Sequence, residues 1–233
     1  MLPFIKGYNH EQTTSAKESA VSAQPLYLCE KYRPLKIADF IGLAEPKRVL
    51  QKIAANPCGR ALLFEGETGS GKTAMAQAFA NEIQAQVHIL PAPDCTRENL
   101  ARVWANCQWK PKAGFRMHLV LVDQADLLRK NQQMDLRSKI DGLESLDNVI
   151  WVFTATPTAK LDAGFRSRCL HLKFSTYGNS SAAADLLERV WKAEAPTAAP
   201  PNFARIVKEA NGDIRAALMR IELKLAAGRP HFG

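Results

Sequence analysis

Residues 66–73 read GETGSGKT, and the spacing of their glycines and their Lys-Thr pair fits the phosphate-binding pattern G-x-x-x-x-G-K-[ST]. The glycines allow backbone N–H groups to close around a β-phosphate, and the dipole of a following helix adds positive potential there. Lys72 can reach the β- and γ-phosphate oxygens, while the Thr73 hydroxyl can ligate Mg²⁺. This octapeptide therefore predicts a site for ATP and Mg²⁺.

The residues on either side of the octapeptide support this interpretation. An apolar run at 61–64 precedes it, and an alanine-rich helical pattern at 74–80 follows it. A chance glycine-rich turn would not require a strand before it and a helix after it. The residues expected to surround the phosphates are Thr68, Gly69, Ser70, Gly71, Lys72, Thr73 and Ala74.

Asp123 is the acidic partner that such a loop requires. It ends the apolar run 118–122, about fifty residues after Lys72, which is where a second residue of a Mg²⁺ site is expected. The alternative is an ordinary aspartate that leads a strand into a turn. The spacing favours the metal role, shared with Thr73.

The elements that must position these side chains alternate along the chain. Short apolar runs predict buried strands, and amphipathic stretches between them predict helices, which indicates an α/β fold with a five-stranded parallel sheet flanked by helices. The expected strands are 62–64, 87–90, 118–122, 149–153 and 170–174. Three helical stretches follow, at about 180–194, 201–210 and 212–226, as a small helical lid. We expect a flexible arm at 1–27, a nucleotide-binding domain at 28–175 and the lid at 176–228.

Composition narrows the class of protein. The chain has 233 residues, of which 46% are hydrophobic, so it can bury a substantial core. We expect no secretory signal and no membrane span, and therefore a cytoplasmic or nuclear location. The five cysteines are scattered and never form C-x-x-C, so neither a disulfide framework nor a zinc site is expected. His88, His118 and His171 lie in apolar strands and are interpreted as core or edge histidines.

Several motifs together resemble one family. The sequence DQAD at 123–126 is similar to the Asp-Glu-Ala-Asp of AAA+ ATPases, especially the small subunits of sliding-clamp loaders such as replication factor C. EKYRPL at 30–35 and DFIG at 39–42 resemble the opening motifs of that family. The resemblance implies that four residues line an adenine pocket, namely Tyr32, Pro34, Ile41 and Gly42.

Two arginines acquire roles from the same resemblance. FRSRC at 165–169 is similar to the Ser-Arg-Cys motif of the family, which implies that Arg168 reaches into the ATP site of a neighbouring subunit. GDIR at 212–215 resembles the sensor-2 motif, which implies that Arg215 lies over the γ-phosphate. Each would place a cation near developing phosphate charge.

Two positions depart from the family pattern. Gln124 stands where the family has a glutamate that polarises the attacking water, and an amide can orient that water but cannot accept its proton. The sequence leaves two explanations open: a natural switch or silent subunit, or a glutamine introduced to trap the ATP-bound state. Thr156 occupies the sensor-1 position, where the family often has asparagine, and offers a hydroxyl instead.

The resemblance also predicts partners. It covers an ATPase module and lid only, and an arginine that acts in a neighbour implies a homo- or hetero-oligomer. The net charge of +8 and two basic clusters favour double-stranded DNA over a merely solvated basic face. The clusters are Lys110, Lys112 and Arg116, then Arg129, Lys130, Arg137 and Lys139. We expect an ATP-binding subunit that hydrolyses slowly and acts with a sliding clamp or another replication protein; the alternative is a non-hydrolysing scaffold that recruits such a partner.

Overall fold

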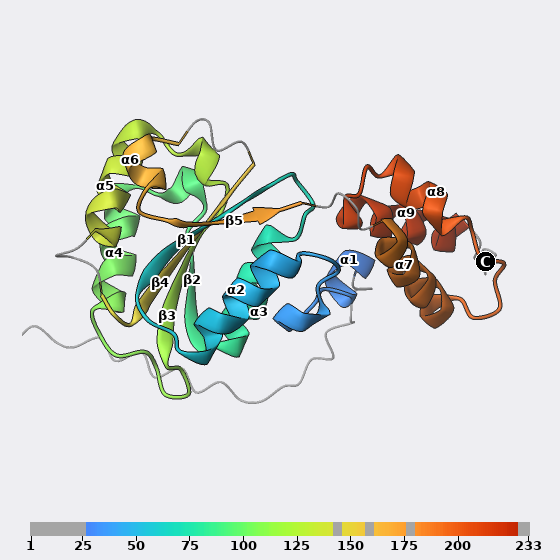
Figure 1. The fold of residues 1–233 in the computed structure, drawn as a ribbon, viewed down its shortest axis with the longest axis horizontal. Coiled ribbons are helices and arrows are strands. Elements are labelled where there is room, and N and C mark those ends of the chain that lie inside the picture. Colours follow the sequence, from blue (N-terminus) through green and yellow to red (C-terminus); the bar gives the residue numbers. More distant parts are fainter. Residues whose placement is uncertain (1–26, 142–145, 157–160, 176–179, 228–233) are drawn as a thin grey trace, which may run out of the picture.

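The computed structural model describes residues 27–141, 146–156, 161–175 and 180–227 (Figure 1). A five-stranded parallel sheet has the order β2-β3-β4-β1-β5. Its strands are β1 (Arg60–Gly66), β2 (Ala85–Ile89), β3 (Met117–Val122), β4 (Val149–Ala155) and β5 (Leu170–Phe174). The predicted parallel sheet is therefore confirmed, with the phosphate-loop strand β1 between β4 and β5.

Two of the three interior strands, β3 and β4, are buried along their whole length, which explains their unbroken apolar runs. Successive side chains of a strand point to opposite faces, so each strand supplies two cores. Leu119 and Leu121 pack in one cluster, while Val120 and Val122 pack in the other. Helices must therefore cover both faces of the sheet.

Those helices form two layers, one on each side of the sheet (Figure 1). The layer that includes Leu119 is covered by η1 (Ile37–Asp39), α2 (Ala44–Ala55) and α3 (Lys72–Glu82). The opposite layer contains η2 (Ala92–Asp94), α4 (Arg97–Cys107), η3 (Ala125–Leu127), α5 (Lys130–Ile140) and α6 (Ala163–Arg166). The phosphate loop thus joins a central strand to a helix that is buried on the sheet.

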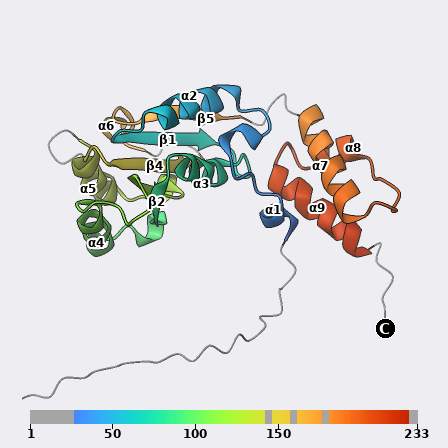
Figure 2. The same cartoon turned by 90° about the horizontal axis from the view of Figure 1, so that it is seen from below.

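A separate helical bundle lies beyond one end of the sheet (Figure 2). It consists of α7 (Ser180–Glu194), α8 (Phe203–Glu209) and α9 (Ile214–Ala227), close to the three helices expected. Its core includes Leu187, Ile206 and Ile221. The short helix α1 (Leu28–Lys31) adds Leu28 to this core, although it precedes the sheet in the chain.

Two further expectations concern the ends of the chain and the membrane. Residues 1–26 of the expected arm lie outside the described residues. Among the helices that are described, none combines the length and the apolar character needed to cross a membrane.

Candidate functional site: a nucleotide pocket at the carboxyl edge of the sheet

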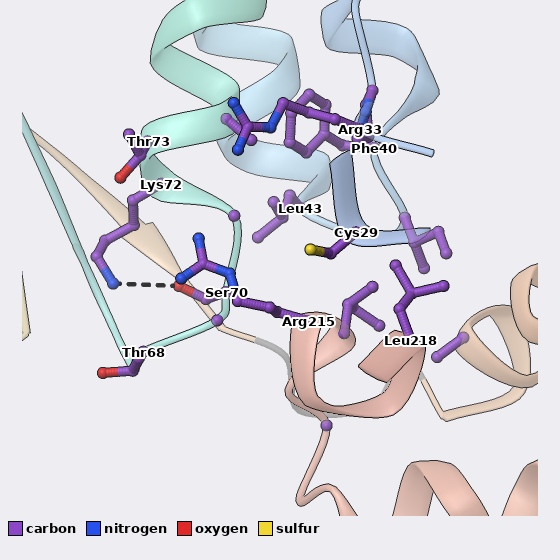
Figure 3. Close-up of a pocket in the computed structure, with 18 of the residues that line it drawn as sticks. Cys29, Arg33, Phe40, Leu43, Thr68, Ser70, Lys72, Thr73, Arg215 and Leu218 are labelled. Atoms are coloured by element: carbon purple, nitrogen blue, oxygen red, sulfur yellow. Dashed lines mark hydrogen bonds between the residues drawn. The ribbon is translucent and has the colours of Figure 1, made fainter. Parts of the chain in front are cut away.

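A cavity of about 1090 Å³ lies where the carboxyl ends of the strands face the helical bundle (Figure 3). Most of the predicted site residues line it: Tyr32, Pro34, Ile41, Thr68, Gly69, Ser70, Gly71, Lys72, Thr73, Ala74, Asp123, Gln124, Thr156 and Arg215. Gly42 and Arg168 do not line it. Residues far apart in the sequence therefore converge on one cavity, at the edge where parallel α/β sheets place their ligands.

The phosphate loop leaves β1 at Gly66 and enters α3 at Lys72. Gly69 and Gly71 have φ angles of 76° and 88°, the left-handed conformation that glycine adopts without a steric penalty. Lys72 is buried and folds back over its own loop, where its Nζ donates to the carbonyl oxygens of Gly66 at 2.8 Å and Glu67 at 2.7 Å. The loop thus holds its cation in place before any phosphate arrives.

The charge of Lys72 is set by two opposing effects. Burial lowers the pKa of Lys72, because the ammonium loses hydration. The carboxylates of Asp123 and Asp126 offset part of this effect and the guanidinium of Arg215 adds to it, so the pKa of Lys72 stays below its usual value. The carboxylates at the strand ends therefore favour the charged form that phosphate binding requires.

Thr73 and Asp123, the two residues predicted to share a Mg²⁺ ion, are hydrogen-bonded to each other. The Thr73 Oγ1 donates to the Asp123 Oδ1 at 2.9 Å, although the two residues are 50 positions apart. Hydroxyl and carboxylate oxygens are ligands that Mg²⁺ accepts. This oxygen pair, one from the first turn of α3 and one from the residue after β3, fits a magnesium ion bound beside the phosphates.

Thr154 is a site residue that the sequence reasoning missed. It is buried at the end of β4, and its Oγ1 donates to the Asp123 Oδ1 at 2.5 Å while accepting the Gln124 backbone N–H at 3.0 Å. One hydroxyl therefore orients both the acidic residue and the backbone of Gln124. Its place two residues before Thr156, at the end of a buried strand beside β3, was the signal available in the sequence.

Gln124 and Thr156 lie beside this pair. Gln124 is exposed in the pocket and has a φ angle of 57°, which is uncommon for a residue other than glycine. Thr156 is bound to the fourth residue of the DQAD motif: its backbone N–H and its Oγ1 each lie 3.2 Å from a carboxylate oxygen of Asp126. The hydroxyl expected to orient water is thus itself oriented by Asp126.

The other end of the pocket is largely apolar. Cys29 of α1, Leu43 just before α2 and Leu218 of α9 line it (Figure 3). Tyr32 also lines the pocket, and its hydroxyl donates to Glu194 Oε1 on α7 at 2.6 Å. Burial, and secondly this hydrogen bond, raises the pKa of Tyr32 to about 12. An apolar end opposite a phosphate loop suits the base of a nucleotide.

The helical bundle contributes the beginning of α9. Asp213 caps that helix, since its Oδ1 accepts the Ala216 N–H at 2.9 Å. Its carboxylate also lies against the phosphate loop, so close that a Cβ on Gly69 would stand 2.0 Å from it. Arg215, two residues further, is exposed and makes no hydrogen bond or ion pair to another described residue.

Arg168, like Gly42, does not line the cavity. It follows α6, which lies across the sheet from the helical bundle (Figure 1). Its Nε lies 2.5 Å from Asp141 Oδ2, and its Nη1 donates to the Gly164 carbonyl at 2.6 Å. Arg168 therefore does not reach the pocket of its own chain.

Comparison with known proteins agrees with this geometry. The family model described as "ATPase family associated with various cellular activities (AAA)" matches residues 62–176. The chain is 28% identical over 219 residues to the replication factor C large subunit of Thermofilum pendens, covering 91% of this chain and 52% of that protein. It is 25% identical over 205 residues to the small subunit of Halobacterium salinarum, covering 85% of this chain and 63% of that protein.

A solved structure shows the same fold. The Thermotoga maritima RuvB Holliday junction branch migration motor superposes with a TM-score of 0.69 at 20% identity, over 84% of this chain and 65% of that one. The chain thus spans between about half and two thirds of the length of the proteins named here.

Proposed function

Because the chain contains an AAA ATPase domain and is homologous to replication factor C subunits over most of its length, we propose that it binds ATP with Mg²⁺ as one subunit of a clamp-loader-like assembly acting on DNA. Nucleotide binding follows from the family of the domain. The proposal that the nucleotide is ATP bound with Mg²⁺ rests on the residues of the site. The observation that carries it is the Thr73–Asp123 hydrogen bond beside the buried Lys72, since it joins the metal and phosphate parts of one pocket.

The proposed roles follow from where each group lies. Residues 68–74 hold the phosphates through backbone N–H groups, and Lys72 exchanges its loop carbonyls for phosphate oxygens. Thr73 and Asp123 hold Mg²⁺, which neutralises phosphate charge when bound. Arg215 supplies a second cation from the bundle side. Tyr32, Pro34 and Ile41 line the cavity and shape its adenine end, and Gly42, which does not line it, follows Ile41 in the chain.

Gln124 makes the proposed hydrolysis slow. An amide can orient water through its oxygen and N–H groups, but it takes no proton. A general base contributes about 10²–10⁴-fold, so we propose that ATP binding is retained while turnover is reduced by that order. Thr156 and Thr154 keep their orienting roles in either case.

The position of Arg168 supports assembly of the chain with neighbouring subunits. Because its side chain is partly exposed and lies outside its own pocket, it is available to the ATP site of a neighbouring subunit once its pair with Asp141 opens. A fixed arginine supplied from a neighbour stabilises the charge of phosphoryl transfer. We therefore propose AAA+ neighbours, identical or different, as the first partners.

DNA is the proposed target because basic side chains gather on α5 and on the residue just before it. Arg129 and Lys130 at the start of α5 are exposed. Two others are engaged within the chain: Arg137 lies 3.3 Å from Asp162, and the Lys139 Nζ stands 5.2 Å from the Trp104 ring centre. Binding through such groups is salt-dependent and independent of sequence. We further propose that the chain acts with a sliding clamp or another replication protein. The proposed location is the cytoplasm, at the nucleoid, or the nucleus.

A second function is favoured by the same Gln124. A protein that binds ATP and does not hydrolyse it can serve as an ATP-dependent scaffold or switch that recruits a replication or mobile-element protein. The intact Lys72, Thr73, Asp123, Arg168 and Arg215 favour the first proposal over this one.

The deciding experiment measures ATP turnover with and without duplex DNA for this chain and for Gln124→Glu. The first proposal expects turnover to rise by about 10²–10⁴-fold with glutamate, and DNA to stimulate it. ATP bound tightly by both proteins without turnover in either would support the scaffold. If neither protein binds ATP, both proposals fail.

A further inference from the structure

A second group of side chains with metal-binding atoms lies at the outer edge of the sheet, away from the nucleotide pocket. His88 is on the edge strand β2, His118 is at the start of β3, and Cys107 is the last residue of α4. One ligand atom from each lies within 4.8 Å of the others. None of the three lines the nucleotide pocket.

His118 is oriented by the protein. Its Nε2 lies 3.0 Å from the carbonyl oxygen of Trp109, an acceptor, so Nε2 carries the proton and Nδ1 presents a lone pair. That Nδ1 faces the His88 Nε2 at 3.0 Å. A histidine that donates its other ring N–H to a backbone carbonyl has the arrangement found around metal ligands.

A hydrogen bond between the two rings would explain the 3.0 Å contact without a metal. It does not explain the thiol beside them. Cys95 and Cys169, the other buried cysteines of the described chain, donate to the carbonyls of Leu90 and Phe165 at 3.8 and 3.6 Å. Cys107 is fully buried, yet its Sγ has no hydrogen-bond partner among the described residues.

We propose that His88, Cys107 and His118 bind one zinc ion, with water in the fourth position on the side where His88 is partly exposed. Two imidazole nitrogens and one thiolate suit zinc, at about 2.0–2.1 Å for nitrogen and about 2.3 Å for sulfur. Tetrahedral ligand atoms then lie roughly 3.3–3.6 Å apart, so small side-chain rotations bring the three together.

The ion would fasten the edge strand to the layer behind it. β2 pairs with β3 alone among the described strands, so its outer edge has no backbone partner in that part of the chain. A bond from His88 to zinc, and from zinc to the end of α4, holds this strand against α4 by side chains as well. Zinc binding therefore stabilises the folded chain by mass action.

The test uses the full chain, freed of metal with a chelator and without nucleotide. Zn²⁺ is titrated against a chromophoric competitor, and Co²⁺ is added separately while absorption is recorded. We expect about one ion per chain, a rise in melting temperature with Zn²⁺, and the thiolate-to-cobalt charge-transfer band that a cysteine ligand produces. Cobalt at Asp123 and Thr73 would give no such band, because both offer oxygen alone.

The variants compare this cluster with matched residues elsewhere. Cys107→Ser should abolish the charge-transfer band, and His88→Gln should weaken zinc binding by about tenfold or more. Cys95→Ser and His171→Gln change a buried cysteine and a strand histidine outside the cluster, and should leave both unchanged. Should Cys107→Ser fail to fold, the partly exposed His88→Gln decides. Absence of stoichiometric binding, or equal loss in cluster and control variants, overturns the proposal.

Discussion

The nucleotide pocket has two sides, the sheet side and the side of the helical bundle. They differ in whether the predicted side chains are already held in place within one chain. On the sheet side, Lys72, Thr73 and Asp123 are fixed by hydrogen bonds to the loop and to each other. The predicted arginines are not fixed in the pocket: Arg215 is exposed at the start of α9, and Arg168 is held by Asp141 and the Gly164 carbonyl outside it.

This difference separates the groups proposed to bind the nucleotide from the groups proposed to act in its hydrolysis. The groups proposed to hold phosphate and Mg²⁺ are already held by hydrogen bonds within the chain, which lowers the cost of ordering them on binding. In the proposed reaction, the two arginines would reach the γ-phosphate from the helical bundle and from a neighbouring subunit. A single chain is therefore expected to bind nucleotide better than it converts it.

The largest effect is expected for Arg168→Ala in the Gln124→Glu background. If Arg168 serves a neighbour, the turnover of the assembly should fall by about 10³-fold or more, since such arginines contribute about 10³–10⁵ in rate. ATP affinity should be unchanged, because Arg168 does not line its own pocket. Steady-state turnover at saturating ATP measures this. Arg48→Ala, an exposed arginine on α2, is the control, and an equal loss there would contradict the comparison.

A smaller effect is expected for Lys72→Ala. Loss of a charged hydrogen-bond donor of about 1.5–3 kcal/mol corresponds to about 10–100-fold weaker ATP binding. Titration calorimetry measures it, with the exposed Lys52→Ala on α2 as control. Unchanged affinity would mean that the sheet side does not hold the phosphates.

Thr154→Val should destabilise the sheet side itself. The change keeps the shape but leaves the Gln124 N–H unpaired and removes one donor from Asp123, at a cost of about 1–3 kcal/mol. Urea unfolding reports the free energy, and the dependence of ATP binding on Mg²⁺ should weaken with it. Thr154→Ser keeps the hydroxyl and should retain that dependence; if valine and serine behave alike, Thr154 only fills space.

The smallest effect is expected on the bundle side, for Tyr32→Phe. Its hydroxyl donates to Glu194 and joins α1 to α7, so the loss should cost about 0.5–1.5 kcal/mol. Urea unfolding followed in the bundle measures it. Tyr27→Phe is the matched control, because Tyr27 is 64% exposed. An equal loss of unfolding free energy in the control would mean that the contact between α1 and α7 does not stabilise the bundle.

The features that local pattern determines could be predicted from the sequence. The five strands depend on apolar runs, and the phosphate loop depends on eight consecutive residues. Asp123 could be predicted because parallel strands end at one edge of the sheet. A capping threonine before a helical stretch is a local pattern of the same kind: the Thr96 hydroxyl accepts the Asn99 N–H at 3.2 Å at the start of α4.

Features that depend on pairing between distant segments could not be predicted. Thr154 matters only because β4 lies beside β3, which brings its hydroxyl to a residue 31 positions away. Leu28 joins the bundle although it precedes the sheet in sequence. The cluster of His88, Cys107 and His118 draws on three elements, and the scattered cysteines gave no spacing that would reveal it.

The contact between Asp213 and Gly69 has a consequence for how nucleotide enters. A carboxylate that rests on the phosphate loop is an anion already in the neighbourhood of Lys72, where its charge raises the pKa of that lysine. An incoming phosphate carries the same sign and competes with it. We therefore expect nucleotide binding to require that the Asp213 carboxylate move off the loop, so that the apparent affinity is the intrinsic one scaled by the fraction of molecules in which it has moved. The side chain that caps α9 is thus expected to compete with the phosphates for the loop.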